Sequence, residues 1–304
     1  MLLPDPIRRA IEERAEALGF AELKRAATAL SDAYREGRKP HLADEARTAA
    51  YLVTRMPATY AAAYTVLREV RERLGPVESI LDVGAGTGAA SVAARSCFPG
   101  ATLSLVERDA AFAKASREWL PEAELLARDL AGELPERDLV IAAYSLGEAG
   151  GLTHARRLWQ AAHRALVVIE PGTPRGFELI RAVRDQLLAE GAHMIAPCPF
   201  EGACPMVAPD WCHFAARVER SSLHRRVKGG ELGYEDEKYS YVALAREPVS
   251  PAHARVIRHP QHHPGLIVLE ECTPEGLRTE RVTKRSKDAF RAARRAQWGQ
   301  AIDS

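Results

Sequence analysis

Apolar residues recur at helical spacing through the first quarter of the chain. In the opening stretch they are Ile7, Ile11, Ala15 and Leu18. Residues three or four apart share one face of a helix, so this pattern predicts an amphipathic helix. The spacing continues over residues 6–36 and again over residues 43–74, where a Gly-Pro pair ends the run. We therefore predict a helical N-terminal region over residues 1–76.

From residue 78 the pattern changes to short apolar runs that alternate with helical stretches. The runs have the length and composition of buried strands, and they are Ser79–Val83, Leu103–Glu107, Leu125–Ala127, Leu139–Tyr144 and Ala165–Glu170. The helical stretches are Ala89–Cys97, Ala110–Trp119, Leu152–His163 and Gly176–Glu190. Such alternation produces a mostly parallel sheet with right-handed crossovers. The sequence therefore predicts an α/β, Rossmann-like domain over residues 77–250.

The alternation stops at residues 191–218, which combine four prolines with three cysteines. We interpret this segment as an irregular insertion, and Lys238–Arg246 as a later strand of the α/β domain. Residues 251–304 predict a small β-rich appendage. Its expected elements are the strands Arg255–Arg258, Gly265–Glu270 and Leu277–Val282 and a helix Ser286–Trp298.

The composition is that of an ordinary globular protein, with 46% hydrophobic and 27% charged residues among 304. The 42 basic and 41 acidic residues give a net charge of +1, which argues against a protein that coats nucleic acid over its whole surface. The sequence has neither a run of about 18 apolar residues nor a secretory leader pattern, so we expect no membrane contact and a cytoplasmic location. The frequent alanine and arginine suggest a bacterial source.

A glycine-rich loop follows the first predicted strand. Leu81–Gly88 reads Leu-Asp-Val-Gly-Ala-Gly-Thr-Gly and leads into a predicted helix. Glycine lets the backbone approach a ligand closely and adopt positive φ, and the helix N-terminus offers free N–H groups to anionic groups. We predict that this loop binds a nucleotide-like cofactor through Asp82, Gly84, Gly86 and Gly88.

Acidic residues end the next two predicted strands. Glu107 lies about twenty residues after the glycines, where a carboxylate accepts hydrogen bonds from ribose hydroxyls, and Asp129 is placed to meet an adenine amino group. The D-x-G-x-G-x-G spelling favours S-adenosylmethionine over NAD. The fourth strand ends in Tyr144–Glu148, without the Asn/Asp-Pro-Pro-aromatic turn of enzymes that methylate base amino groups. The sequence thus supports cofactor binding more strongly than methyl transfer.

The cysteines suggest a metal centre. Cys198, Cys204 and Cys212 fall within fifteen residues of a proline-rich segment that cannot form regular ladders, and Cys272 is a possible fourth ligand. Structural zinc sites usually contain C-x₂₋₄-C knuckles, whereas the gaps here are five and seven residues. The wide spacing and the Cys-Pro pairs favour an iron–sulfur cluster, with zinc as the alternative. We interpret Cys97 as a small core residue.

Basic residues concentrate near the C-terminus despite the nearly neutral whole. The candidate RNA-contacting residues are Arg278, Arg281, Lys284, Arg285, Arg291, Arg294 and Arg295. A second set is Arg217, Arg220, Arg225, Arg226 and Lys228. Clustered cations favour phosphate binding, and the lack of interleaved aromatic residues favours the backbone of structured RNA over single strands. The alternative is a solvated helix face.

Several motifs together resemble one family, and the likeness runs from about Ala49 to the C-terminus. They are Arg55–Tyr60, Leu81–Gly88, Glu170–Gly176, Cys198–His213, Lys238–Tyr241, Cys272 and Trp298–Gly299. The chain resembles the Rsm-twenty-two family of small-ribosomal-subunit proteins, called methyltransferase-like protein seventeen in animals. The resemblance implies binding to small-subunit rRNA during assembly. It also implies a [4Fe–4S] cluster on Cys198, Cys204, Cys212 and Cys272.

These observations combine into one expected architecture and function. We expect a class I S-adenosylmethionine-dependent methyltransferase fold with a helical N-terminal extension, a cysteine-rich metal-binding insertion and a β-rich C-terminal appendage. The leading hypothesis is a small-subunit assembly factor that binds rRNA and S-adenosylmethionine and carries an iron–sulfur cluster. The alternatives are an active rRNA methyltransferase and a small-molecule methyltransferase with structural zinc.

Overall fold

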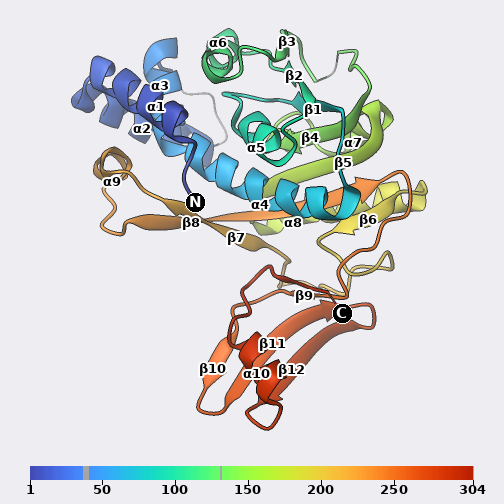
Figure 1. The fold of residues 1–304 in the computed structure, drawn as a ribbon. Helices are drawn as coiled ribbons and strands as arrows, with labels where there is room; N and C mark the ends of the chain where they lie inside the picture. The colour runs from blue at the N-terminus through green and yellow to red at the C-terminus, as the bar shows by residue number, and fades with distance from the viewer. Residues whose placement is uncertain (37–40, 131, 304) are drawn as a thin grey trace.

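The computed structural model describes residues 1–36, 41–130 and 132–303 (Figure 1). The chain begins with the helices α1 (Asp5–Leu18), α2 (Phe20–Arg35), α3 (Asp44–Thr54) and α4 (Met56–Leu74). The apolar face expected from the spacing is buried, because Ile7, Ile11 and Ala15 face the core. No helix in the described part of the chain is long and apolar enough to cross a membrane.

The main sheet of the described residues has eight strands. Its order is β3 (Glu124–Leu126), β2 (Thr102–Val106), β1 (Ser79–Val83), β4 (Arg137–Ala143), β5 (Ala162–Pro171), β8 (Tyr234–Ala245) and β6 (His193–Ala196), and β7 (Phe214–Glu219) also pairs with β8. The first five strands are parallel, and β8 runs antiparallel to β5. This mixed α/β sheet confirms the predicted class I methyltransferase fold.

Helices cover both faces of the main sheet. Residues of α4, α5 (Ala89–Cys97) and α6 (Ala110–Trp119) share one core cluster, and residues of α7 (Leu152–Ala161) and α8 (Pro174–Ala189) share the other. Alternate residues of β4 divide between the two, with Ile141 in the first and Val140 in the second. Burial on both faces explains why these strands read as continuous apolar runs.

The segment expected to be one irregular insertion contains regular structure at both ends. Residues 193–196 form β6, which pairs with β8, and residues 214–219 form β7. Strands β7 and β8 make a hairpin arm that carries α9 (Ser222–Lys228), and β8 begins at Tyr234 rather than Lys238 (Figure 1). The first half of β8 is polar because the arm leaves the core, so hydrophobic patterning alone does not reveal it.

The C-terminal lobe, residues 254–302, is built on a second sheet. Its strands are β9 (Ala254–Val256), β10 (Gln261–His263), β11 (Leu266–Thr273), β12 (Gly276–Thr283) and β13 (Ala301–Ile302). The helix expected to reach Trp298 is shorter: α10 spans Lys287–Ala293. The chain then turns back, because the Trp298 ring packs between His213 and His259 and β13 pairs with β9.

A buried ion pair joins the two sheets. Arg255 of β9 is 2% exposed and donates to both carboxylate oxygens of Glu69 on α4, over 2.5 and 2.9 Å. The same guanidinium donates to the carbonyl oxygens of Pro197 and Gly299, each over 2.9 Å, and the Tyr241 hydroxyl donates to Glu69. Burial raises the pKa of Glu69, but hydrogen bonds and charge from Arg255 and, to a smaller extent, Arg73 outweigh it and hold that pKa below its usual value.

We expect Arg255→Met to lower the free energy of unfolding by about 3–5 kcal/mol, because it leaves the Glu69 carboxylate buried without its main cation. Urea denaturation of both proteins measures the difference. The matched control is Arg68→Met, which removes an exposed i,i+4 pair with Glu72 on the same helix. This control should cost less than about 1 kcal/mol. Equal losses in the two variants would contradict a special role for the buried pair.

Candidate functional site

The glycine loop between β1 and α5 has the backbone that the sequence predicts. Gly84, Gly86 and Gly88 all have positive φ, at 72°, 56° and 83°. A Cβ on Gly84 would lie 2.4 Å from Cβ of Ser145, so only glycine fits there. A Cβ on Gly86 would have no heavy atom of the described residues within 4 Å. The backbone at Gly86 is therefore open to close approach by a ligand.

Two buried polar groups of this loop keep unused hydrogen-bonding capacity. Asp82 is 1% exposed, and its Oδ2 accepts a hydrogen bond from the Ser91 hydroxyl over 2.5 Å. The other carboxylate oxygen of Asp82 and the Thr87 hydroxyl are buried without a partner among the described residues. Burial also raises the pKa of Asp82 to about 6. Such groups are costly unless something pairs with them, and a polar ligand over the loop fits that requirement.

The two predicted acidic residues have different surroundings. Glu107 is buried at the end of β2, where its carboxylate accepts hydrogen bonds from the backbone N–H groups of Gly86 and Asp109, each over 2.7 Å. Each carboxylate oxygen has a second lone pair, so Glu107 can still accept from a ligand beside the loop. Asp129 is half-exposed and forms an ion pair with Arg108 over 2.9 Å. The structure therefore brings Glu107 into contact with the glycine loop and places Asp129 in an ion pair with Arg108.

The ends of β4 and β5 hold a group that the sequence did not single out as a unit. Tyr144 has a φ of 58°, the only positive φ among the described non-glycine residues, and its hydroxyl donates to Glu237 over 3.1 Å. Glu170 accepts a hydrogen bond from the Gly147 N–H over 3.0 Å, and burial raises its pKa to about 7. Burial also raises the pKa of Glu237. Strained backbone and perturbed carboxyl groups are typical of functional sites.

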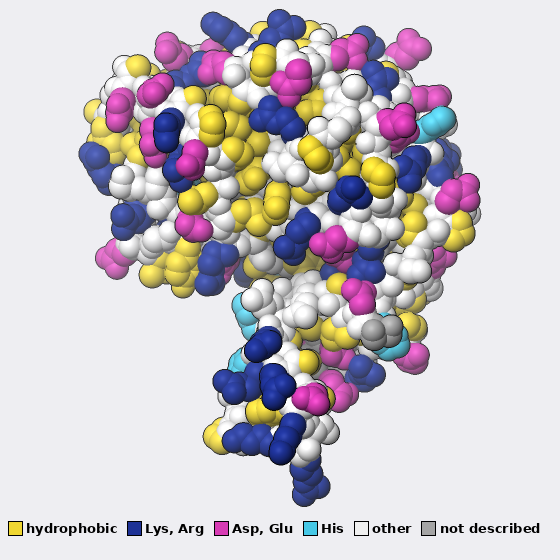
Figure 2. Space-filling view, viewed as in Figure 1, with side chains coloured by type: hydrophobic (Ala, Val, Ile, Leu, Met, Phe, Trp, Pro, Cys, Tyr) yellow, Lys and Arg dark blue, Asp and Glu magenta, His cyan; other side chains and the backbone are white. Residues whose placement is uncertain are grey.

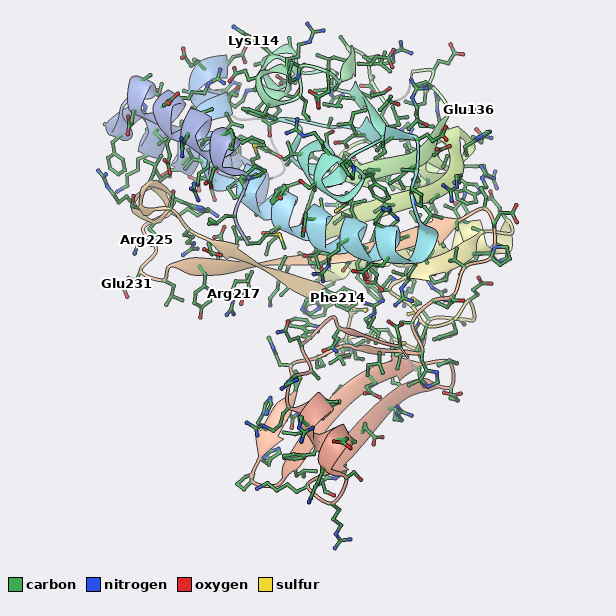
Figure 3. All side chains as sticks on the ribbon, in the orientation of Figure 1. Lys114, Glu136, Phe214, Arg217, Arg225 and Glu231 are labelled. Atoms are coloured by element: carbon green, nitrogen blue, oxygen red, sulfur yellow. The ribbon has the colours of Figure 1, made fainter. Side chains whose placement is uncertain are left out.

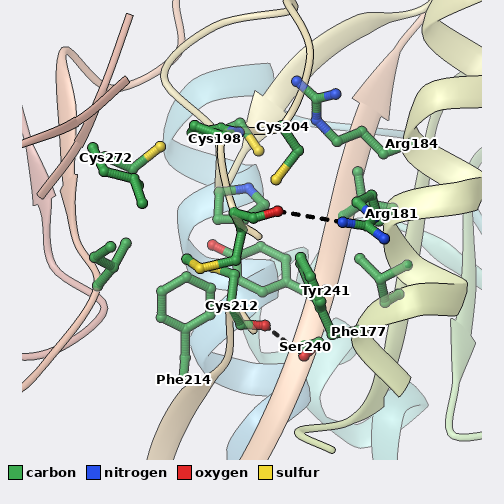
Figure 4. Close-up of a pocket in the computed structure, with 17 residues that line it drawn as sticks. Phe177, Arg181, Arg184, Cys198, Cys204, Cys212, Phe214, Ser240, Tyr241 and Cys272 are labelled. Carbon is green, nitrogen blue, oxygen red and sulfur yellow. Dashed lines mark hydrogen bonds between the residues drawn. The ribbon is translucent and has the colours of Figure 1, made fainter. Parts of the chain in front are cut away.

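The four predicted cysteine ligands line one cavity between the two sheets (Figure 4). Cys198, Cys204 and Cys212 come from the segment between β6 and β7, and Cys272 comes from β11. The cavity is also lined by Phe177, Arg184, Pro197, Tyr241 and Ile257. Cys97 lies on α5 and packs against the main core, as interpreted. The fold therefore brings together four thiols from segments about sixty residues apart or more.

Burial favours the protonated thiol at Cys198, Cys212 and Cys272. It raises the pKa of Cys198 and Cys212, and it raises the pKa of Cys272 to about 12; charge on neighbouring thiols adds to each shift. Metal binding would therefore have to displace protons. Within the three described ranges, no three His, Cys, Asp or Glu side chains are arranged to hold a single metal ion. The four cysteines line one shared cavity.

Side chains, rather than strand ladders, hold the cysteine segment in place. The Trp211 indole donates to the Gly172 carbonyl over 3.0 Å, and the Ser240 hydroxyl donates to the Cys212 carbonyl over 2.8 Å. Arg184 donates to the carbonyl oxygens of two residues in the segment, and Arg181 donates to that of Met206. The proline-rich composition made such external support necessary.

The predicted RNA-contacting residues lie on the C-terminal lobe, which shows many basic side chains (Figure 2). Two of them are paired, because Arg278 contacts Glu271 over 2.6 Å and Arg291 contacts Asp288 over 3.3 Å. The others form no ion pair with a described residue: Arg281, Lys284, Arg285, Arg294 and Arg295. We call these five residues the unpaired cations of the lobe.

The second basic set lies on the hairpin arm (Figure 3). Most of its charge is neutralised there, since Arg217 pairs with Asp236 through two hydrogen bonds, and Arg220 and Lys228 both pair with Glu235. Arg226 stacks over the ring of Phe20. The arm therefore offers a weaker field to phosphate than the sequence suggested.

Comparisons with known proteins place the chain in a family. A family model described as "Mitochondrial small ribosomal subunit Rsm22" matches residues 45–303. The "Rsm22-cox11 tandem protein 2, mitochondrial" of Schizosaccharomyces pombe is 26% identical over 317 residues, covering 82% of this chain and 42% of that protein. The human "Ribosome assembly protein METTL17, mitochondrial" is 26% identical over 293 residues, covering 83% of this chain and 61% of that protein. The chain thus spans about half the length of these curated relatives.

Solved methyltransferase structures resemble part of the chain. The magnesium protoporphyrin IX methyltransferase of Synechocystis is 14% identical with a TM-score of 0.41, covering 62% of this chain and 80% of that one. The precorrin-6y C5,15-methyltransferase of Geobacter metallireducens is 18% identical with a TM-score of 0.39, covering 61% and 86%. The family model covers most of this chain and agrees with the motifs of its sequence, and the chain belongs to the Rsm22 family.

Proposed function

We propose that this chain assists assembly of the small ribosomal subunit by binding rRNA, and that it carries an iron–sulfur cluster and binds S-adenosylmethionine. The observation that carries the proposal is the set of four thiols, drawn from two separate segments, around one buried cavity in a member of the Rsm22 family. The family description names the mitochondrial small ribosomal subunit, and the human relative is named a ribosome assembly protein. We extend that role to this chain.

The cysteine cavity favours a cluster over a zinc ion. Structural zinc sites usually contain C-x₂₋₄-C knuckles, whereas gaps of five and seven residues separate Cys198, Cys204 and Cys212. In a [4Fe–4S] cluster each thiolate binds a different iron, so the thiolates surround a larger body. Cys198, Cys204, Cys212 and Cys272 would hold the cluster. When bound, the cluster would cross-link the cysteine segment to the C-terminal lobe.

The glycine loop is the proposed site of S-adenosylmethionine. Open backbone at Gly86, the unpaired oxygen of Asp82 and the unpaired hydroxyl of Thr87 would meet the methionine and ribose parts of the cofactor. Glu107 would accept from the ribose hydroxyls. Asp129, the residue predicted to meet the adenine amino group, already pairs with Arg108 through its carboxylate.

Methyl transfer to rRNA is a second candidate function. Glu170 favours it, because a carboxyl group with a pKa of about 7 can take up a proton at neutral pH. Transfer of a labelled methyl group from the cofactor to immature small subunits separates this candidate from binding alone.

The unpaired cations of the lobe are the proposed RNA-binding surface. Exposed cations without an acidic neighbour are free to neutralise phosphates, whereas a paired arginine must first give up its carboxylate. The lobe carries five such residues, and the arm retains chiefly Arg225. We therefore place rRNA against the lobe.

Removing unpaired charge should weaken RNA binding more than removing paired charge. We expect the triple variant Lys284→Gln, Arg285→Gln and Arg294→Gln to bind small-subunit rRNA less tightly. The slope of log affinity against log salt should become shallower by about 2–3, since each lost phosphate contact contributes about 0.7–0.9. The matched control replaces the paired residues Arg217, Arg278 and Arg291 by Gln and should change the slope by less than about 1. Filter binding at several salt concentrations measures both, and equal slopes would contradict the assignment.

S-adenosylmethionine should stabilise the protein against heat. At a hundredfold excess over its dissociation constant the ligand adds about 2.7 kcal/mol. Gly86→Val should abolish the stabilisation, because its side chain fills the space over the loop. The control is Gly19→Val: Gly19 also has a positive φ, 83° against 56° at Gly86, and open surroundings, but it lies between α1 and α2. Calorimetry measures the melting temperature of the three proteins with and without S-adenosylmethionine. Retained stabilisation in Gly86→Val would refute the glycine loop as the binding site.

Anaerobically purified protein should contain about four iron atoms per chain, the number in a [4Fe–4S] cluster. Serine at any of Cys198, Cys204, Cys212 or Cys272 should lower the iron content, since each thiol supplies one ligand. Cys97→Ser should retain full iron and serves as the matched control. Iron and sulfide assays with the visible absorption spectrum provide the measurement. Stoichiometric zinc in iron-supplied anaerobic protein would establish the alternative metal.

A further inference from the structure

One buried arginine at the cysteine cavity has hydrogen-bonding capacity that its oxygen partners do not use. Arg184 of α8 is 3% exposed and lines the cavity beside Cys198 and Cys204 (Figure 4). Its Nη2 donates to the carbonyl oxygens of Phe200 and Gly202 over 3.2 and 2.6 Å, and its Nη1 donates to Asp185 over 2.7 Å. Its Nε is buried and has no acceptor among the described residues.

A charged N–H buried without an acceptor is expensive, because it loses its water without replacement. The residues that line the cavity with Arg184 include Cys198 and Cys204, whose sulfur atoms can accept a hydrogen bond. Cys198 lines the same cavity as Arg184 (Figure 4), so a cluster bound there would lie against the guanidinium. A thiolate is a better acceptor than a thiol because it carries the charge that the guanidinium needs.

Arg255, the other buried cation beside the cysteine segment, is already neutralised. Arg255 is paired with the buried carboxylate of Glu69, over 2.5 and 2.9 Å. The only carboxylate paired with Arg184 within the described ranges is Asp185, whose side chain is 52% exposed and therefore screened by water. Arg184 thus presents the less compensated positive charge to the cavity.

We propose that Arg184 hydrogen-bonds the sulfur shell of the cluster at Cys198 and raises the reduction potential of the cluster. This inference rests on the proposed iron–sulfur centre. A reduced cluster carries one more negative charge than an oxidised one, so a nearby cation and N–H donor stabilise the reduced form. Arg184 is a positioning residue in the sense that it acts through a ligand and not on a substrate.

The rival explanation is that Arg184 only clamps the cysteine segment through Phe200 and Gly202. The two explanations differ in the role of Asp185. A clamp is indifferent to the charge of an exposed neighbour, whereas an electrostatic effect grows when the compensating carboxylate is removed. Asp185→Asn and Arg184→Gln should therefore move the potential in opposite directions.

The test is a redox titration of the full chain, purified anaerobically, with dithionite as reductant and the visible absorption and electron paramagnetic resonance of the cluster as readouts. Iron and sulfide are counted first in each protein. Arg184→Gln should lower the ratio of reduced to oxidised cluster at fixed potential about tenfold, which is 59 mV for one electron. Arg184→Lys keeps the charge but loses the planar fork. Its ratio of reduced to oxidised cluster should lie between the ratios of Arg184→Gln and the unmodified chain. Asp185→Asn should raise the ratio.

Opposite shifts in Arg184→Gln and Asp185→Asn establish the proposal. Unchanged potentials in variants that retain full iron overturn it. If Arg184→Gln loses its iron, Arg184→Lys and Asp185→Asn still decide, because both keep a cation at position 184. Absence of iron and sulfide from the unmodified chain would defeat the cluster assignment itself, and the assay reveals that before any titration begins.

Discussion

The pairing of Glu69 with Arg255 determines how the rest of the molecule is arranged. Glu69 belongs to α4, which packs across one face of the main sheet, and Arg255 belongs to β9 of the C-terminal lobe. The same guanidinium holds the Pro197 carbonyl, one residue before Cys198. One buried side chain therefore fixes the lobe, the start of the cysteine segment and the helix that covers the sheet. Because a buried pair is costly when half of it is missing, the three parts are coupled in free energy.

The parts of the site that depend on local sequence were predictable. The glycine loop needs positive φ and a backbone that a ligand can approach closely, and glycine residues within the eight-residue segment Leu81–Gly88 meet both requirements. The α/β sheet was predictable from local sequence too. Helices show apolar residues every three or four positions, whereas buried strands show short continuous apolar runs. The cysteines were recognisable because thiols in a proline-rich segment are unusual, although only the fold could show Cys272 beside the others.

The parts that depend on distant contacts were not predictable. Glu69 and Arg255 are 186 residues apart, and nothing in either local sequence marks it as a partner. Arg184 reads as one polar position of an amphipathic helix, and its buried environment appears only when the segment around Gly202 packs over it. The early end of α10 follows from the capture of Trp298 by two histidines, a tertiary contact that overrides helical periodicity.

The antiparallel pairing of β8 also constrains the order in which the chain matures. Among the described residues, strand β6 pairs with β8, and Glu69 pairs with Arg255 of β9 as well as with Arg73 of its own helix, so two earlier segments are completed by later ones. As synthesis proceeds from the N-terminus, the first five strands can assemble while a buried acid and a row of thiols are still incomplete. The C-terminal lobe therefore emerges after the helices and strands that it completes, and a product truncated before Arg255 would retain the cofactor loop but lack the guanidinium that pairs with Glu69.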